Sequence, residues 1–182
     1  MNHVFIYAQP TSQEKDARIA EISAVRVSGF GPYRKHNIQK AYRDTNVNPT
    51  LLNDLYTEII TPEPYILVSY QKEVTRALLR NENEKIGTDD KFFGRSWLDI
   101  NDLAWPLLVS GLIKSRTLEA LAAFFRVEVV LGSNSDTGDI VEALLKIYGS
   151  MMRQYNTALK GESIVREAGG ETLQSLRDMI GF

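Results

Sequence analysis

The chain has 182 residues, of which 24% are charged, with a formal net charge of -2 at pH 7, no cysteine and two histidines. The length fits one globular domain, and the lack of cysteine excludes a disulfide framework, a thiolate zinc site, an iron–sulfur cluster and a cysteine nucleophile. No apolar run approaches the roughly 20 residues that a membrane-spanning helix needs, so we expect a soluble cytoplasmic protein without membrane contact. The near-neutral charge argues against coating of nucleic acid by bulk charge but leaves room for a local basic patch.

The N-terminal third predicts an antiparallel meander of three strands. Residues 3–8 are mostly β-branched and aromatic and are followed by Pro10. Residues 18–27 alternate apolar and polar side chains in their latter half, as a half-buried strand does. A turn rich in glycine and proline then leads to a third predicted strand over residues 33–42.

The middle of the chain predicts alternating strands and helices. The apolar run at residues 65–70 is typical of a strand buried on both faces, and residues 96–100 form a second such candidate. Apolar spacing predicts helices over residues 48–60, 72–81, 102–108 and 117–125. This alternation favours parallel strands covered by helices.

A long amphipathic helix is predicted over residues 139–159. Asp136 or Thr137 could cap it, and Asp139 would lie in its first turn, where a carboxylate complements the helix dipole. A short helix over residues 171–180 follows the glycines of the C-terminal region. We therefore expect an α/β domain over residues 1–154 and a helical C-terminal extension over residues 155–182.

The order of these elements and several local motifs resemble the DEDD 3′–5′ exonucleases of the DEDDh type. Residues 5–11 read Phe-Ile-Tyr-Ala-Gln-Pro-Thr where that family has an apolar strand carrying Asp-x-Glu-Thr-Thr. Residues 18–25 read Arg-Ile-Ala-Glu-Ile-Ser-Ala-Val and resemble the family's Arg-Ile-Ile-Glu-Ile-Gly-Ala-Val. Residues 67–75 read Leu-Val-Ser-Tyr-Gln-Lys-Glu-Val-Thr and lie over Leu-Val-Ala-His-Asn-x-x-Phe-Asp.

Three further motifs continue the resemblance. Residues 97–104 are similar to Ile-Asp-Thr-x-x-Leu-Ala, residues 118–127 to Leu-x-x-Leu-Ala-x-x-Phe-Gly-Ile, and residues 134–143 to His-x-Ala-x-x-Asp-Ala-x-x-Thr. The resemblance covers roughly residues 3–153 and implies a ribonuclease-H-like mixed α/β sheet. Its first three strands would be antiparallel and the later ones parallel, with helices on both faces.

The resemblance also implies a site in which four carboxylates hold two divalent metal ions and a histidine activates water. Tyr7 and Gln9 stand at the first Asp and Glu positions, Thr75 at the middle Asp position, and Asn134 at the histidine position. Only Asp139 matches a catalytic carboxylate of the family. Because Tyr7 and Gln9 share one face of their strand, both side chains would point where the missing carboxylates belong. One carboxylate is too little charge for two divalent cations, so we expect no metal and no other cofactor.

These substitutions indicate a pseudo-exonuclease that serves as an accessory, structural or binding subunit of a larger assembly. The alternative is an active 3′–5′ exonuclease that uses Mg²⁺ or Mn²⁺ with an aberrant ligand set around Asp139. Asp139 is equally well explained as a helix-start carboxylate. Asp99 and Asp102 are conceivable replacement ligands, but Asp102 is better interpreted as capping or opening the helix that follows.

Basic residues suggest where nucleic acid could bind. Lys72, Arg76 and Arg80 recur every four residues and share one face of a predicted helix, although a solvated helix face explains the same spacing. Arg34 and Lys35 lie among aromatic residues, a combination that can contact phosphates and stack bases. His3 and His36 are interpreted as surface or edge residues.

The extension over residues 155–182 carries considerable apolar surface. It could pack on its own domain or bind a partner's groove. Exonucleases of the family commonly act with a partner polymerase, which favours a protein partner.

Overall fold

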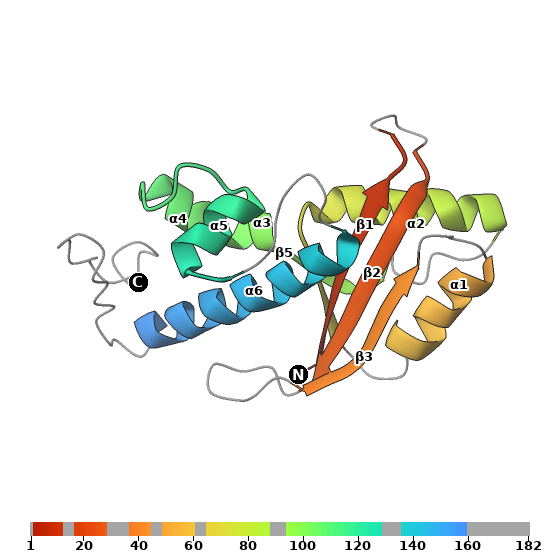
Figure 1. Cartoon of the computed structure of the whole chain (residues 1–182), viewed down its shortest axis with the longest axis horizontal. Coiled ribbons are helices and arrows are strands. Elements are labelled where there is room, and N and C mark those ends of the chain that lie inside the picture. Colours follow the sequence, from red (N-terminus) through yellow and green to blue (C-terminus); the bar gives the residue numbers. More distant parts are fainter. Residues whose placement is uncertain are drawn as a thin grey trace.

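A five-stranded mixed sheet forms the centre of the computed structural model, which describes residues 2–12, 17–28, 37–44, 49–60, 65–87, 94–128 and 136–159 (Figure 1). The strand order is β3-β2-β1-β4-β5. The strands are β1 (Asn2–Pro10), β2 (Ile19–Ser28), β3 (Asn37–Asp44), β4 (Tyr65–Ser69) and β5 (Ser96–Asp99).

The pairing changes direction at the central strand. β1 pairs antiparallel with β2, and β2 pairs antiparallel with β3. On its other side β1 pairs parallel with β4, which pairs parallel with β5. Tyr7 lies opposite Ser23 and Gln9 lies opposite Glu21 in the β1–β2 ladder. The predicted antiparallel meander followed by parallel strands is confirmed.

Helices cover both faces of the sheet and enclose two apolar cores. One core packs against α1 (Pro49–Asp54), the π-helix η1 (Leu55–Ile60) and α2 (Lys72–Ile86). The other packs against α3 (Ile100–Leu103), α4 (Trp105–Val109), α5 (Leu118–Phe125) and α6 (Thr137–Leu159). β1 supplies both cores, because its even-numbered residues face the first and its odd-numbered residues face the second.

Helix α2 continues five residues beyond the predicted end at residue 81. The sequence prediction ended it there because the following residues are polar. In the structure Glu82 and Asn83 are buried, and each has a polar partner: Arg18 for Glu82 and the Tyr56 hydroxyl, at 2.7 Å, for Asn83. These partners come from distant parts of the chain, so helical periodicity alone could not reveal them.

Other boundaries also differ from the sequence prediction. The helix predicted over residues 102–108 is two short helices, α3 and α4, and Pro106 at the start of α4 cannot donate a backbone hydrogen bond to a continuous helix. The single helix predicted over residues 48–60 is α1 followed by the π-helix η1. Strand β3 covers residues 37–44 and so continues two residues beyond the predicted end at residue 42, while residues 33–36 lie outside the described residues. The helix predicted over residues 171–180 lies outside the described residues.

Within the described ranges, no helix combines the length and apolar character needed to cross a membrane.

The predicted boundary between residues 154 and 155 falls inside α6, which is continuous to Leu159. Tyr155 packs against the second core and donates its hydroxyl hydrogen to the Leu103 carbonyl. Burial raises the pKa of Tyr155 to about 12. The first turn of the predicted extension is therefore part of the domain's own helix packing.

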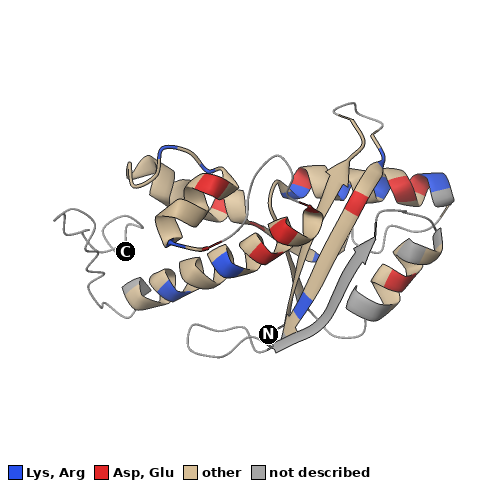
Figure 2. Ribbon diagram, in the orientation of Figure 1, with Lys and Arg blue, Asp and Glu red and all other residues tan. Residues whose placement is uncertain are grey.

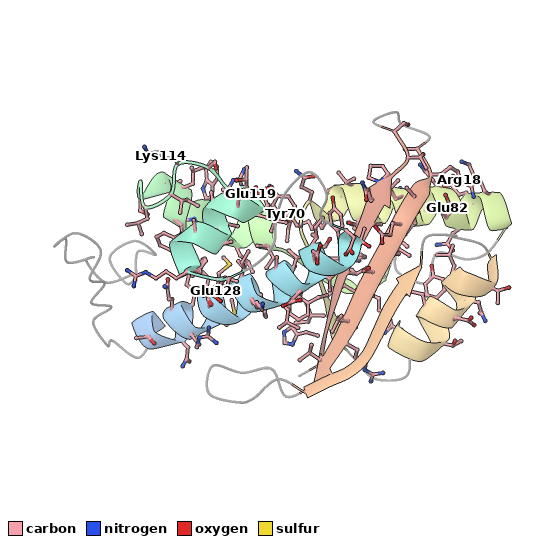
Figure 3. The ribbon with its side chains drawn as sticks, viewed as in Figure 1. Arg18, Tyr70, Glu82, Lys114, Glu119 and Glu128 are labelled. Atoms are coloured by element: carbon pink, nitrogen blue, oxygen red, sulfur yellow. The ribbon has the colours of Figure 1, made fainter. Side chains whose placement is uncertain are left out.

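An ion pair between the half-exposed Arg18 and the buried Glu82 joins the start of β2 to α2. The Arg18 guanidinium donates to both carboxylate oxygens of Glu82 at 2.6 Å, and the Ile19 N–H donates to the same carboxylate at 3.2 Å (Figure 3). Burial by itself would raise the pKa of Glu82, but the hydrogen bonds from Arg18 and Ile19 outweigh it and lower the pKa below its usual value. Ionised Glu82 thus holds two separate segments together.

We expect Glu82→Gln to lower the free energy of unfolding at pH 7 by about 1.5–3 kcal/mol, since charge-assisted hydrogen bonds are lost. Because the folded-state pKa of Glu82 is lowered, this stabilisation is fully present above about pH 4.5 and disappears as the pH falls through the lowered pKa. Urea unfolding between pH 7 and pH 3 should therefore show the difference between wild type and variant shrinking in acid. Glu84→Gln, an exposed change on the same helix, is the control and should have little effect at pH 7. A difference that stays constant down to pH 3 would contradict this account.

Candidate degenerate active site

The N-terminus of α6 meets β2 beside Tyr7 and Gln9, the residues at the motif positions of the first two carboxylates. The hydroxyls of Ser23 and Thr137 lie 2.7 Å apart and are hydrogen bonded, and the Thr137 N–H donates to Glu21 Oε2 at 3.2 Å. Ser23 is opposite Tyr7 in the ladder, and Glu21 is opposite Gln9. Directly opposed residues project from the same face of a sheet, so α6 begins next to both.

Asp139 is used in capping α6. Asp136 Oδ1 accepts from the Asp139 N–H at 2.9 Å, and Asp139 Oδ2 accepts from the Asp136 N–H at 3.2 Å. This reciprocal pair of hydrogen bonds is a capping box. Of the two residues predicted as possible caps, Asp136 and Thr137, Asp136 is therefore the N-cap. One oxygen of the single matching carboxylate therefore serves the start of its own helix.

Tyr7 fills volume on the α6 face of the sheet. It is partly buried against the second core, and burial raises the pKa of its phenol. The neighbouring Tyr70 also has a raised pKa, mainly from burial and further from the charge of Glu119 (Figure 3). Both phenols are therefore neutral near pH 7. Gln9, two residues after Tyr7, is exposed.

Thr75 belongs to a different environment. It is buried in the first turn of α2, and its hydroxyl is hydrogen bonded to that of Ser69 at 3.1 Å. Ser69 shares a face of β4 with Leu67, which packs in the core on the α2 side. The structure thus brings Tyr7, Gln9 and Asp139 to the α6 side, while the Thr75 hydroxyl lies on the α2 side. Asn134 lies outside the described residues.

Asp99 anchors the carboxyl edge of the sheet. It is 7% exposed, and its carboxylate accepts from the N–H groups of Gln71 at 3.1 Å, Lys72 at 2.8 Å and Asn101 at 2.9 Å. It caps α3 and also holds the start of α2, where Gln71 adopts a left-handed backbone with φ of 55°. The cap is therefore Asp99, while Asp102 lies in the first turn of α3 and so opens that helix.

The predicted basic face of α2 is partly paired with acids. Lys72 Nζ lies 2.8 Å from Asp102, and this hydrogen bond raises the lysine pKa. Arg76 lies 3.3 Å from Glu73 on the same helix, and Arg80 is exposed. Figure 2 shows acidic and basic residues mixed along α2. Arg34 and Lys35 lie outside the described residues.

An exposed aromatic–cation pair is connected to the Lys72 end of this face through Asn101 and Asp102, and it was missed from the sequence. Trp105 is 54% exposed, and the Arg116 guanidinium carbon lies 5.0 Å from the centre of its ring. The Arg116 guanidinium also donates to the Asn101 carbonyl at 3.1 Å. Asn101 immediately precedes Asp102, the residue that pairs with Lys72. Trp105 occurs in an apolar helical stretch, which predicts a core residue, so no sequence signal marked it as exposed.

Glu21 and Ser23 were also missed, although a signal existed. Both are buried and contact α6, and alternation along β2 places them on one face. Pairing register with β1 was needed to connect them with Tyr7 and Gln9. His3, predicted as a surface or edge residue, is buried at 4% exposure and its Nε2 is hydrogen bonded to the Tyr148 hydroxyl at 3.1 Å. That prediction was wrong because the central strand is covered on both faces.

Comparison with known proteins supports the fold. No protein-family model and no curated protein matches the sequence. The chain is similar to the crystal structure of a full-length 3′-exonuclease, with a TM-score of 0.58 and 12% sequence identity over 96% of this chain and 89% of that one. It is also similar to the crystal structure of cell-death related nuclease 4, with a TM-score of 0.57 and 9% identity over 86% of this chain and 64% of that nuclease.

These likenesses define the class of fold. The chain has the mixed sheet of the ribonuclease-H-like exonucleases, as the motif resemblance predicted. Identities of 12% and 9% show the fold alone, so activity has to be argued from the residues.

We expect Asp99→Ala to lower the free energy of unfolding by about 1–3 kcal/mol, because it leaves three partly buried N–H groups at two helix starts without their acceptor. Asp102→Ala removes only an exposed ion pair and is the control, with an expected change below about 1 kcal/mol. Chemical unfolding of both variants measures the difference. Equal effects of the two substitutions would show that Asp99 does not anchor this edge.

Proposed function

We propose that this chain is a catalytically inactive 3′–5′ exonuclease-like domain that acts in the cytoplasm as an accessory or binding subunit of a larger assembly. The observation that carries the proposal is Tyr7, a neutral and partly buried phenol at the position of the family's first metal-binding aspartate. Its bulk and its lack of charge both oppose cation binding there.

The donor chemistry of the remaining positions supports the same conclusion. Gln9 offers a neutral amide, and the Thr75 hydroxyl is bonded to Ser69. Asp139 is the one anionic group in the set, and one of its oxygens accepts a backbone N–H. Divalent cations such as Mg²⁺ prefer several anionic oxygens, so these residues do not fit a two-metal site. The described residues include no cluster of three or more His, Asp or Glu suited to a metal ion.

The alternative function is an active exonuclease with an aberrant ligand set around Asp139. Glu21 favours it to a limited extent, because it brings a second carboxylate to the start of α6. Glu21 accepts the Thr137 N–H, however, and so already has a structural role.

Purified full-length protein is expected to show no Mg²⁺- or Mn²⁺-dependent release of nucleotides from 3′-labelled single-stranded DNA or RNA. An active 3′-exonuclease in parallel reactions provides the positive control. Degradation that follows the protein through purification and disappears in Asp139→Ala would overturn the proposal and establish the alternative.

Single-stranded nucleic acid is the binding partner that the surface favours. Exposed ion pairs such as Lys72–Asp102 contribute little, so phosphate groups can replace the carboxylates at low energetic cost. The exposed ring of Trp105 offers a surface on which a base can stack, and Arg116 beside it supplies positive charge. A protein partner remains the other form of the accessory role.

We expect single-stranded oligonucleotides to bind at low salt and to dissociate as salt rises, with the salt dependence reduced in the Lys72, Arg76 and Arg80 triple alanine variant. Trp105→Ala should cost about 1–3 kcal/mol of binding free energy through lost stacking. Lys85→Ala, an exposed cation in the last turn of α2, is the matched control. Fluorescence anisotropy of a labelled oligonucleotide measures the affinity of the wild type and of these three variants. If the wild type does not bind single-stranded oligonucleotides at low salt, the partner in the accessory role is a protein.

A further inference from the structure

A cationic hollow lies between the end of α5 and the middle of α6, away from the degenerate site. It has a volume of about 500 Å³, and Arg126, Lys146 and Arg153 line it. In Figure 3 the labelled Glu128, also a lining residue, marks where the chain leaving α5 reaches α6. Arg153 is 14 residues beyond Asp139, which is about 21 Å along the helix axis. The hollow is therefore a second site and not part of the first.

The backbone of Arg126 is the first indication of a role. Arg126 is the C-cap of α5 and adopts a left-handed conformation with φ of 53°. Glycine is the favoured residue there because a Cβ atom is strained in this region. The exonuclease motif that residues 118–127 resemble has Gly at this position. An arginine at this position costs conformational energy that a glycine would not, which motivates a search for a role of its side chain.

The α6 side of the hollow presents polar groups from one helix face. Lys146, Ser150 and Arg153 are spaced four and three residues apart, and Arg153 donates to Ser150 Oγ at 2.9 Å. Lys146 Nζ donates to the Glu128 carbonyl at 3.0 Å and pairs with Glu142. The lining thus has three basic side chains, those of Arg126, Lys146 and Arg153, and one acidic side chain, that of Glu128.

The remaining wall is apolar and partly buried. It is formed by Phe125, Val127 and Leu145, and Phe125 packs edge-on against Phe124 with ring centres 4.9 Å apart. The hollow is open to solvent, and its volume falls within the range of small-molecule sites. Guanidinium groups match the oxygens of a phosphate, and an apolar wall suits a flat ring.

We infer that this hollow binds a phosphate monoester that carries a flat ring, the chemistry of a nucleoside monophosphate. Arg126 and Arg153 bind the phosphate, Lys146 adds charge, and the ring lies against Phe125 and Leu145. The inference is independent of the proposed exonuclease-like accessory role, because it uses neither Tyr7 nor the basic face of α2.

Calorimetric titration of the full-length protein with adenosine 5′-monophosphate tests the inference. Adenosine 5′-monophosphate should bind, inorganic phosphate should bind more weakly, and adenosine should not bind measurably. Ribose 5-phosphate separates the two contributions, since it retains the phosphate and lacks the base. Absence of binding by both adenosine 5′-monophosphate and phosphate at millimolar concentration would overturn the inference.

Arg126→Gly is the most informative variant because it restores the residue that the backbone favours. We expect a thermal midpoint equal to or above that of the wild type, together with an at least tenfold loss of affinity for adenosine 5′-monophosphate. Arg153→Gln should lower the affinity for adenosine 5′-monophosphate to a similar extent. If Arg126→Gly does not fold, the affinity of Arg153→Gln tests the site. Lys114→Gln, which removes an exposed cation away from the hollow, should leave affinity unchanged. Wild-type affinity in both arginine variants would refute the site.

Discussion

The alternation of side chains along the central strand β1 is the constraint on which the rest of the structure depends. β1 pairs with β2 on one side and β4 on the other, and both of its faces are covered. Val4, Ile6 and Ala8 face one core, while Phe5 and Tyr7 face the other. A shift by one residue would exchange these sets, so the register that builds the two cores also fixes Tyr7 and Gln9 on the α6 side.

Buried carboxylates in this chain serve the fold. Glu82 is neutralised by Arg18 and the Ile19 N–H, and Asp99 accepts three backbone N–H groups at the starts of α2 and α3. Glu21 accepts the first N–H of α6. Buried charges are tolerated when such donors satisfy them, and here each joins segments that are distant in the sequence. These three carboxylates, those of Glu82, Asp99 and Glu21, therefore have structural roles.

Helix α6 connects the two regions of possible function. Its N-terminal turn carries Asp139 and packs on β2 beside the degenerate positions. Lys146 and Arg153 lie further along the same helix and line the cationic hollow with Arg126. The two regions lie on different turns of this helix, so the proposed inactive site at its start and the cations further along can be tested separately.

The sequence by itself determined the antiparallel meander, the later parallel strands and the approximate positions of the long helices. These depend on local periodicity and on turn residues, which are written in short segments of the chain. It also located Tyr7, Gln9, Thr75 and Asp139 at the motif positions, because strand alternation and motif spacing are local properties.

Only the tertiary structure decided the polar partners and the exposure of single residues. Asp99 rather than Asp102 caps α3, α2 continues through Glu82, His3 is buried and Trp105 is exposed. The burial of Glu82 and of His3 depends on groups far away in the sequence, Arg18 for Glu82 and Tyr148 for His3. The hollow at Arg126 needed the same information, since α5 and α6 contribute its cations from separate segments that meet only when the chain folds.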